Sequence, residues 1–285
     1  MPNSRSPDSP SPASPSPASP SDDELLAAAQ QGDSTAVEAL LERHEKSIYR
    51  FGLRMCGSEA EAQDVLQETL LAAFKGLPSF RGDAELSTWL YQVARSFCVK
   101  SRRRHVGEPA VMASLDDAAV RETASGAASA EARVHAQQIG QAISASLLGL
   151  SDTHREAIVL KDVEGLSAEA IAKILGEDVA AVKSRIHRAR VELRRSLTAL
   201  LGDSAGPAPC PELAELLSGY VSHDIDQSTC AVIETHLATC PNCTAACNDL
   251  QRTVSLCRRI PGGTVPSAVQ KAVRRALQQQ SVGRE

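Results

Sequence analysis

Apolar residues recur at spacings of three and four along two long stretches of this chain, and this repeat constrains the fold more than any other feature. The first stretch runs from Asp22 to about Arg104, and the second from about 136 to 201. Such a repeat places apolar side chains on one face of an α-helix. A large β-sandwich or barrel would need aromatic residues throughout, but they make up only 3% of this sequence. We therefore predict an all-α fold.

Segments rich in Gly, Pro and Ser divide the helical stretches into modules. Proline at seven of the first twenty positions predicts a disordered start. The predicted order is a disordered tail over 1–21, a helical domain over 22–105, a flexible linker over 106–135, a helix-turn-helix domain over 136–202, a small helical cysteine-rich domain over 207–260, and a tail over 261–285 with a basic amphipathic helix at 267–280.

The net charge of −5 conceals two basic clusters. Residues 95–105 contain five Lys or Arg and no acid, and residues 183–195 contain six against the single acid Glu192. Separate basic clusters on an acidic background indicate local phosphate contacts rather than general coating of nucleic acid. The alternative is that both are solvated helix faces.

The second basic cluster lies in a segment with the signals of a helix-turn-helix. Ser167 and Asp178 can each N-cap a helix, and Gly176 stands where a left-handed residue would end the first one. On the second helix, a stripe of Val182, Ile186, Ala189 and Leu193 is predicted to be buried. The polar residues expected to stay available for the DNA major groove are Lys183, Ser184, Arg185, His187, Arg188 and Arg190. An ordinary helical hairpin with solvated arginines is the alternative.

The first helical stretch contains two chemically distinct parts. Asp64, Gln67 and Glu68 form a polar, acidic companion to an apolar helix face, which suits a basic protein partner or plain solvent exposure. Further along, aromatic rings alternate with arginines, a pattern that suits single-stranded DNA because rings stack on bases while cations follow phosphates. The candidate contacts are Phe80, Arg81, Trp89, Arg95, Arg102 and Arg103. The alternative is that the aromatic residues, Trp89 above all, belong to the core.

Six of the eight cysteines lie between residues 210 and 257. No signal-peptide pattern and no run of about 18 apolar residues is present, so we expect a cytoplasmic protein with reduced thiols and no membrane partner. The spacing C-x25-H-x3-C-x2-C, formed by Cys210, His236, Cys240 and Cys243, suits tetrahedral zinc.

Three further cysteines exceed the needs of one zinc ion: Cys230, Cys247 and Cys257. They are either small apolar residues on helices or additional ligands of a thiolate-rich site for soft ions such as copper, cadmium or zinc. A thiol redox switch is a rival interpretation.

These stretches together resemble a known family. Residues 64–91 read DVLQETLLAAFKGLPSFRGDAELSTWLY and resemble the polymerase-binding and promoter −10 region of extracytoplasmic-function (ECF) sigma factors of the sigma-70 family. Residues 147–195, which include VKSRIHRAR, resemble the −35-binding domain of the same family. The motif HLATCPNC and its surroundings over 210–250 resemble the zinc-binding anti-sigma fold. The combination resembles metal-responsive sigma factors with a cysteine-rich C-terminal domain, the CorE type.

The resemblance implies a function and its sites. The acidic surface around Asp64, Gln67 and Glu68 would dock on the clamp helices of the core RNA polymerase. The loop near 79–87 would capture a flipped −10 base, and the helix beginning near Val179 would read the −35 element of promoter DNA. The cysteine-rich domain would bind metal and regulate both. The runner-up is a helix-turn-helix activator that is not a sigma subunit. Because the sequence has no Gly-rich phosphate loop and no nucleophile–base motif, we do not expect an enzyme.

Overall fold

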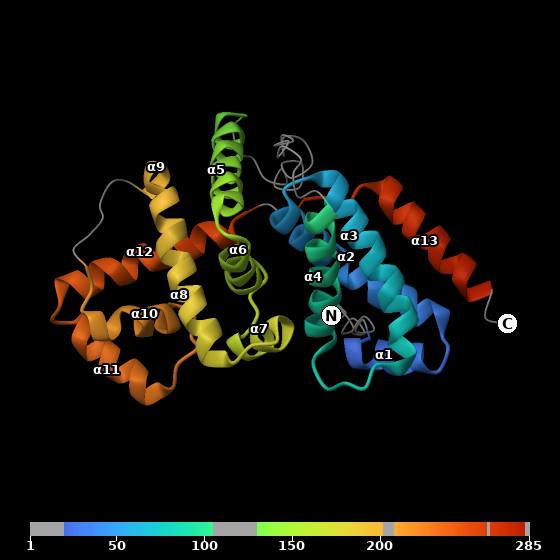
Figure 1. Ribbon diagram of the computed structural model, residues 1–285, viewed down its shortest axis with the longest axis horizontal. Helices are drawn as coiled ribbons and strands as arrows, with labels where there is room; N and C mark the ends of the chain where they lie inside the picture. Colours follow the sequence, from blue (N-terminus) through green and yellow to red (C-terminus); the bar gives the residue numbers. More distant parts are fainter. Residues whose placement is uncertain (1–19, 105–129, 202–207, 261–262, 283–285) are drawn as a thin grey trace, which may run out of the picture.

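The computed structural model describes residues 20–104, 130–201, 208–260 and 263–282, and within them it contains helices and no strand (Figure 1). The predicted all-α fold is confirmed. The elements are α1 Asp22–Gln30, α2 Ser34–Cys56, α3 Glu59–Gly76, η1 Leu77–Ser79, α4 Leu86–Arg104, α5 Ala130–Gly149, α6 Asp152–Ile158, η3 Val159–Val163, α7 Ala168–Leu175, α8 Val179–Ser196, α9 Thr198–Leu201, η4 Pro211–Leu213, α10 Ala214–Val221, α11 Gln227–Leu237, α12 Pro241–Arg258 and α13 Ser267–Val282. The tail predicted over 1–21 and the linker predicted over 106–135 lie mostly outside the described residues.

The first module comprises α1 to α4 and is built around α2 and α3. Capping residues fix where its helices begin: Ser21 forms a capping box with Glu24, and the Asp33 carboxylate accepts from two backbone N–H groups of α2. Its core is fully buried and includes Tyr49 and Phe51, whose ring packs edge-on against Tyr91 at a centroid distance of 5.5 Å.

The second module comprises α5 to α9, and its α7–α8 pair is the predicted helix-turn-helix. Ser167 and Asp178 cap the two helices as expected, and Gly176 adopts a left-handed conformation with φ of +72°. One boundary differs from expectation: α5 begins at Ala130, about six residues earlier than the second helical stretch was predicted to begin. The segment AEARVHAQ consists mostly of helix-favouring residues, so the helix extends into the expected linker.

The first and second modules pack directly on each other. The Glu164 carboxylate accepts hydrogen bonds from Arg50 Nε at 2.7 Å and from the Tyr91 hydroxyl at 2.7 Å. Arg155 donates to the Met55 carbonyl at 2.9 Å. The Arg50 side chain is 29% exposed, whereas the Glu164 side chain is fully buried. Because a buried carboxylate without partners is costly, these donors favour direct packing of the first module on the second.

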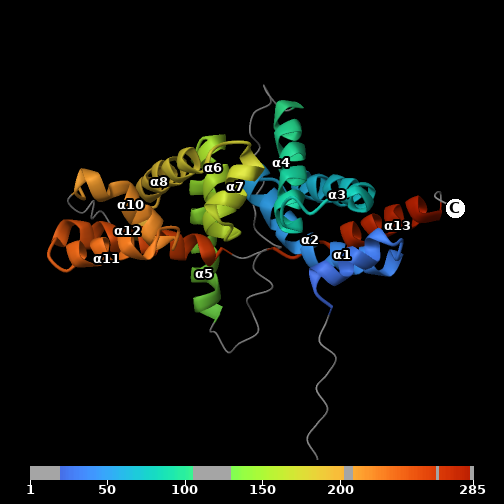
Figure 2. The same cartoon turned by 90° about the horizontal axis from the view of Figure 1, so that it is seen from below.

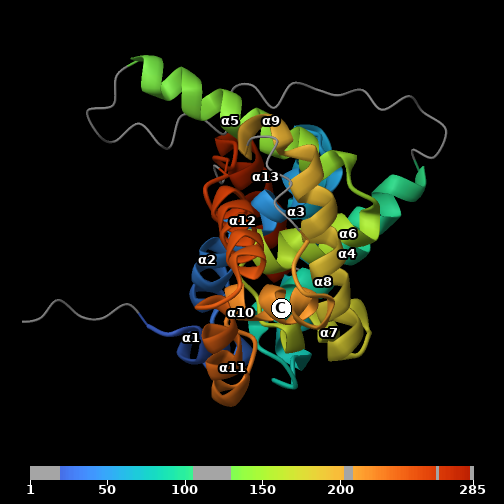
Figure 3. The same cartoon turned by 90° about the vertical axis from the view of Figure 1, so that its left-hand side faces the viewer.

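The cysteine-rich module comprises η4 and α10 to α12 and lies beside α8, away from the first module (Figures 1 and 2). Its own small core contains Leu213, Leu217, Ile233 and Val254. Figure 3 views the molecule from the side on which this module lies. The C-terminal end of α12 carries Cys257 into the core of the second module, so the two modules share buried apolar surface.

The last helix, α13, returns from the cysteine-rich module to the first module (Figure 1). It matches the amphipathic helix expected at 267–280, and its apolar side chains Val269 and Val273 are buried in the core of the first module. Arg274 forms an ion pair with Glu42. The C-terminal part of the chain therefore contacts both preceding modules. None of the described helices is long and apolar enough to cross a membrane.

Candidate DNA-binding helix and metal centre

Helix α8 presents a buried stripe and a polar face, as the sequence predicted. Val182, Ile186, Ala189 and Leu193 are all at most 3% exposed. Arg188 lies exposed on the opposite side. Arg185 is part-buried and forms an ion pair with Glu177 at 2.5 Å, so the turn of the helix-turn-helix holds its guanidinium. We call α8 the recognition helix.

The cysteine-rich module covers part of the polar face of the recognition helix. Lys183 Nζ donates to the backbone carbonyl of Asp224 at 3.0 Å, and Ser184 Oγ donates to the Glu215 carboxylate at 2.8 Å. His187 is also part-buried there, and burial lowers its pKa. A cavity of about 120 Å³ remains between Lys183 and Ile186 on one side and α10 on the other.

Arg190 is not available for DNA in this arrangement, which corrects the expectation from the sequence. Its side chain is fully buried. Its Nε donates to Asp162 at 2.9 Å, its Nη1 donates to the Ser218 hydroxyl and carbonyl at 2.8 Å, and its Nη2 donates to the Ser222 hydroxyl at 2.7 Å. The periodicity did contain a signal, because Arg190 lies four residues after Ile186 and three before Leu193. Its partners could not be identified from the sequence, since Asp162 and Ser218 each lie 28 residues away from it.

A second link between these modules surrounds Asp224. Lys161 is 8% exposed on its side chain, and its ammonium group lies 2.5 Å from the Asp224 carboxylate. The same ammonium donates to the Leu166 carbonyl at 3.1 Å. A buried cation with two acceptors is satisfied only while the cysteine-rich module stays docked. Sequence reasoning missed this pair, since nothing in the local pattern distinguishes Lys161 from a surface lysine.

The acidic surface of α3 is open. Asp64 and Glu68 are exposed and Gln67 is half-buried. They line a cavity of about 230 Å³ together with Phe97 and Ser101 of α4. The three residues predicted to contact polymerase are therefore together on one accessible surface.

The candidate −10 residues lie around the loop between η1 and α4. The Phe80 and Trp89 rings pack at a centroid distance of 5.3 Å, and the half-buried Trp89 also packs against the core. Gly76 permits this packing, because a Cβ there would lie 2.7 Å from the Trp89 ring. Arg81 is exposed. The rings and Arg81 line a cavity of about 510 Å³ that Lys173 of α7 also borders.

Two of the remaining candidate arginines of α4, Arg95 and Arg102, contact the second module. Arg95 Nε lies 3.1 Å from the buried Glu156 carboxylate. Arg102 pairs with Asp152 at 2.7 Å. The side chain of Arg103 lies outside the described residues. In this packing of the first module on the second, two of the predicted DNA contacts are therefore occupied by carboxylates.

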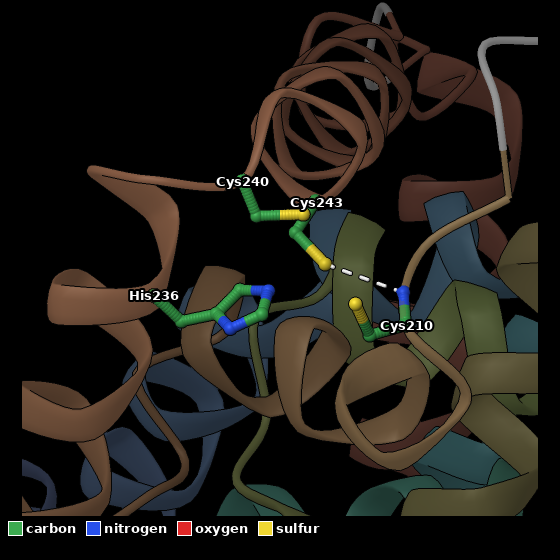
Figure 4. Close-up of side chains that lie close together, drawn as sticks. All are labelled: Cys210, His236, Cys240 and Cys243. Carbon is green, nitrogen blue, oxygen red and sulfur yellow. Dashed lines mark hydrogen bonds between the residues drawn. The ribbon is translucent and has the colours of Figure 1, made fainter.

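The four residues predicted to bind zinc come together. Ligand atoms of Cys210, His236, Cys240 and Cys243 all lie within 4.8 Å of one another. Figure 4 shows the His236 ring, from the end of α11, turned toward the three sulfur atoms. The Cys210 backbone N–H donates to Cys243 Sγ at 3.3 Å. Three distant segments of the module therefore converge on one point.

These four residues fit a zinc ion. Tetrahedral zinc with Zn–S bonds of about 2.3 Å separates its ligand atoms by about 3.7 Å, which the cluster can reach with small side-chain shifts. Nε2 of His236 is buried and has no hydrogen-bond partner among the described residues. The backbone N–H of Cys243 favours the Cys240 thiolate and lowers the pKa of Cys240 to about 7. The donor set is therefore partly prepared for a cation.

The three additional cysteines do not join this four-residue cluster. Cys247 is buried in the core of the cysteine-rich module, and Cys257 is fully buried in the core of the second module. Burial raises the pKa of both thiols. Cys230 is half-buried on α11. In this arrangement, the Cys247 and Cys257 thiols lie among apolar side chains.

Comparisons with known proteins agree with the architecture. Family models match residues 40–107 (Sigma-70 region 2), residues 140–193 (Sigma-70, region 4) and residues 210–244 (a zinc-finger family). The chain is 35% identical to the ECF RNA polymerase sigma factor SigM of Mycobacterium tuberculosis over 177 residues, which are 62% of this chain and 85% of that protein. It is 31% identical to the RNA polymerase sigma-H factor of Pseudomonas aeruginosa over 190 residues, 64% of this chain and 97% of that protein.

A third relative extends the likeness to another bacterial group. The chain is 30% identical to the ECF RNA polymerase sigma factor SigW of Bacillus subtilis over 172 residues, 59% of this chain and 92% of that protein. The resemblance to ECF sigma factors is confirmed, whereas the narrower likeness to the CorE type stays a prediction. Taken with the helix-turn-helix and the Cys/His cluster, the matches show that this chain belongs to the ECF sigma factors of the sigma-70 family and carries a zinc-finger module on the same polypeptide.

Proposed function

We propose that this sigma factor, which directs RNA polymerase to promoters, is restrained in cis by its own cysteine-rich module. The observation that carries the proposal is the contact between α10 and the polar face of the recognition helix, with Ser184 bonded to Glu215 and Lys183 bonded to the Asp224 carbonyl. To read DNA, α8 must insert its polar face into the major groove of the duplex, and α10 occupies this same face. We call the arrangement with α10 docked on the recognition helix the closed form. The closed form is therefore incompatible with −35 recognition.

The proposal assigns roles to the candidate residues. Asp64, Gln67 and Glu68 bind core polymerase, because they form an accessible acidic surface beside apolar residues. Phe80, Arg81 and Trp89 accept the melted −10 strand, with the rings offering a stacking surface. The −35 contacts come from Lys183, Ser184, Arg185, His187 and Arg188, whereas the buried Arg190 is paired with Asp162 of its own module. No reaction is assigned to the chain.

Separation of the first and second modules must break specific links, and polymerase and DNA have to supply the free energy for this. Arg95 and Arg102 must leave Glu156 and Asp152, and Glu164 must lose two donors. A ligand shifts such an equilibrium only by its differential affinity for the two states. Promoter DNA fits this requirement, since its phosphates can replace the carboxylates as partners of the freed arginines.

Metal enters the proposal as the support of the inhibitory module. Cys210, His236, Cys240 and Cys243 would hold zinc, which would crosslink η4, α11 and α12. Loss of the ion would loosen α10, which begins four residues after Cys210, and thereby release the recognition helix. Copper or cadmium, which thiolates also bind, are proposed as the effector ions that disturb this arrangement.

The test is promoter-directed transcription with purified chain and core polymerase. Glu215→Lys brings a cation against the cationic recognition helix and should raise transcription several-fold, because it weakens docking of α10. Glu212→Lys is the matched control: it makes the same charge change three residues earlier, at an exposed position. Equal output from both variants would contradict cis inhibition.

Two further arms separate the remaining interpretations. Initiation with core polymerase and no other factor is the expected baseline, because the chain belongs to the ECF sigma factors. Titration with zinc, copper and cadmium, under reducing and oxidising conditions, shows whether metal or thiol oxidation changes output. Output that stays flat in every metal would limit the cluster to a structural role.

A further inference from the structure

Two cysteines outside the zinc-finger module meet in the core of the first module. Sγ of Cys56, the last residue of α2, lies 3.6 Å from Sγ of Cys98 in the middle of α4. Cys98 is fully buried and Cys56 is partly exposed. The pair is separated by 42 residues in sequence, so only the packing of α2 against α4 brings it together.

The surroundings of this pair favour thiol chemistry. The Arg155 guanidinium interacts electrostatically with Cys56, and that of Arg102 interacts with Cys98. The thiolate is the reactive form of cysteine. The hydrogen bond that the protonated Cys98 thiol shares with Cys56, together with burial, raises the pKa of Cys98 well above its usual range, and the nearby Glu156 carboxylate adds to this. Cys56, with its partial exposure, is therefore the thiol that an oxidant would meet first.

We propose that Cys56 and Cys98 form an oxidant-sensitive dithiol that closes to an intramolecular disulfide on reaction with hydrogen peroxide or another hydroperoxide. The Cys56 thiolate attacks one peroxide oxygen, the O–O bond breaks, and hydroxide leaves, which gives a sulfenic acid on Cys56. Cys98 then attacks the Cys56 sulfur. The S–S bond forms, the S–O bond breaks, and the departing hydroxide takes up the Cys98 proton and leaves as water. With hydrogen peroxide, two thiols are oxidised and one peroxide is reduced to two molecules of water; an organic hydroperoxide gives one water and one alcohol.

The position of the pair connects it to the packing of the first two modules. Arg155 also donates to the Met55 carbonyl, one residue before Cys56. Gly57, one residue after it, lies so close to the second module that a Cβ there would be 2.8 Å from Leu148. A disulfide requires the sulfur atoms to approach from 3.6 Å to about 2.05 Å, so the two side chains must draw together beside this contact. This site is distinct from the zinc-finger cluster, whose four residues lie in another module.

The test uses the full-length, zinc-loaded chain treated with hydrogen peroxide, alkylated, and digested with trypsin without reduction. Mass spectrometry should detect a crosslink between peptides 55–75 and 96–100, with the loss of two free thiols and no loss of zinc. Dithiothreitol should reverse it. Cys56→Ser and Cys98→Ser should each abolish the crosslink, while Cys257→Ser, which removes a buried thiol elsewhere, should retain it.

Three outcomes would overturn the proposal. The first is a native chain that keeps both thiols free under peroxide. The second is Cys56 oxidised to sulfinic acid without a crosslink. The third is a crosslink from Cys56 to a cysteine of the zinc-finger module, or one that forms only after zinc is removed. Because the peptide map of the wild-type chain is sufficient to distinguish them, the test does not depend on how the serine variants fold.

Discussion

Removal of the Ser218 and Ser222 hydroxyls should release the recognition helix without touching any DNA-contacting residue. Both hydroxyls belong to the cysteine-rich module, and both accept hydrogen bonds from the buried Arg190 guanidinium, at 2.8 and 2.7 Å. In the open form, water replaces them. The double variant Ser218→Ala, Ser222→Ala therefore weakens the closed form alone.

The expected size follows from these contacts. A hydrogen bond to a charged group contributes about 1.5 kcal/mol or more, which applies to Ser222. Ser218 contributes less, about 1 kcal/mol, because its carbonyl still accepts from the same Nη1 atom. The sum of about 2.5 kcal/mol corresponds to about 60-fold in the closed-to-open equilibrium. Apparent promoter affinity should rise by up to that factor, since it scales with the open fraction.

The assay is fluorescence anisotropy of labelled promoter duplex with polymerase and sigma factor at fixed salt. The control variant Ser228→Ala, Thr235→Ala removes two hydroxyls of α11 whose hydrogen bonds stay within their own segment. It should bind as the wild-type chain does. Hydrogen exchange measures whether docking of the cysteine-rich module is weakened in the Ser218, Ser222 variant. If docking is weakened and promoter affinity is unchanged, the reasoning is refuted.

Three further predictions concern single surfaces. Charge reversal at Asp64 and Glu68 should lower affinity for core polymerase in pull-down assays and leave thermal stability unchanged, because both carboxylates are exposed; wild-type recovery of core enzyme would count against this surface. Arg188→Ala should weaken promoter binding by about 1–3 kcal/mol with little effect on stability. Arg190→Ala should instead destabilise the closed chain by about 3–5 kcal/mol, because it leaves the Asp162 carboxylate buried and unpaired. Thermal melts and binding curves in which Arg188→Ala lowers stability and Arg190→Ala affects only promoter binding would contradict the burial argument. Cys243→Ser should abolish binding of one zinc per chain and expose α10 to α12 to proteolysis, while Cys247→Ser should keep the metal; metal analysis and limited proteolysis check both.

Local sequence patterns predicted the helices and caps of this molecule better than they predicted its tertiary contacts. The caps at Ser167 and Asp178 and the left-handed Gly176 depend on neighbours within four residues, so the helix-turn-helix could be located from the sequence. The convergence of Cys210, His236, Cys240 and Cys243 could be predicted because Cys and His spacing reflects the geometry that one ion requires.

The contacts that cover the recognition helix could not be predicted in the same way. Arg190, which looked like a surface cation, is buried by two serines and an aspartate from other segments. Cys56 and Cys98 carry no spacing motif, and only the crossing of α2 and α4 joins them. These interactions depend on how modules dock, and hydrophobic periodicity describes each helix without its partner.

The central claim is that α10 and promoter DNA exclude each other on the recognition helix, and photocrosslinking from position 216 tests it most directly. Leu216 is exposed on α10 and borders the cavity beside Lys183 and Ile186. With p-benzoylphenylalanine at this position, irradiation of the free chain should give an intrachain crosslink to residues 179–196. The account predicts that this crosslink disappears in the initiating complex of polymerase, sigma factor and promoter. A crosslink of undiminished yield in a transcriptionally active complex would contradict it.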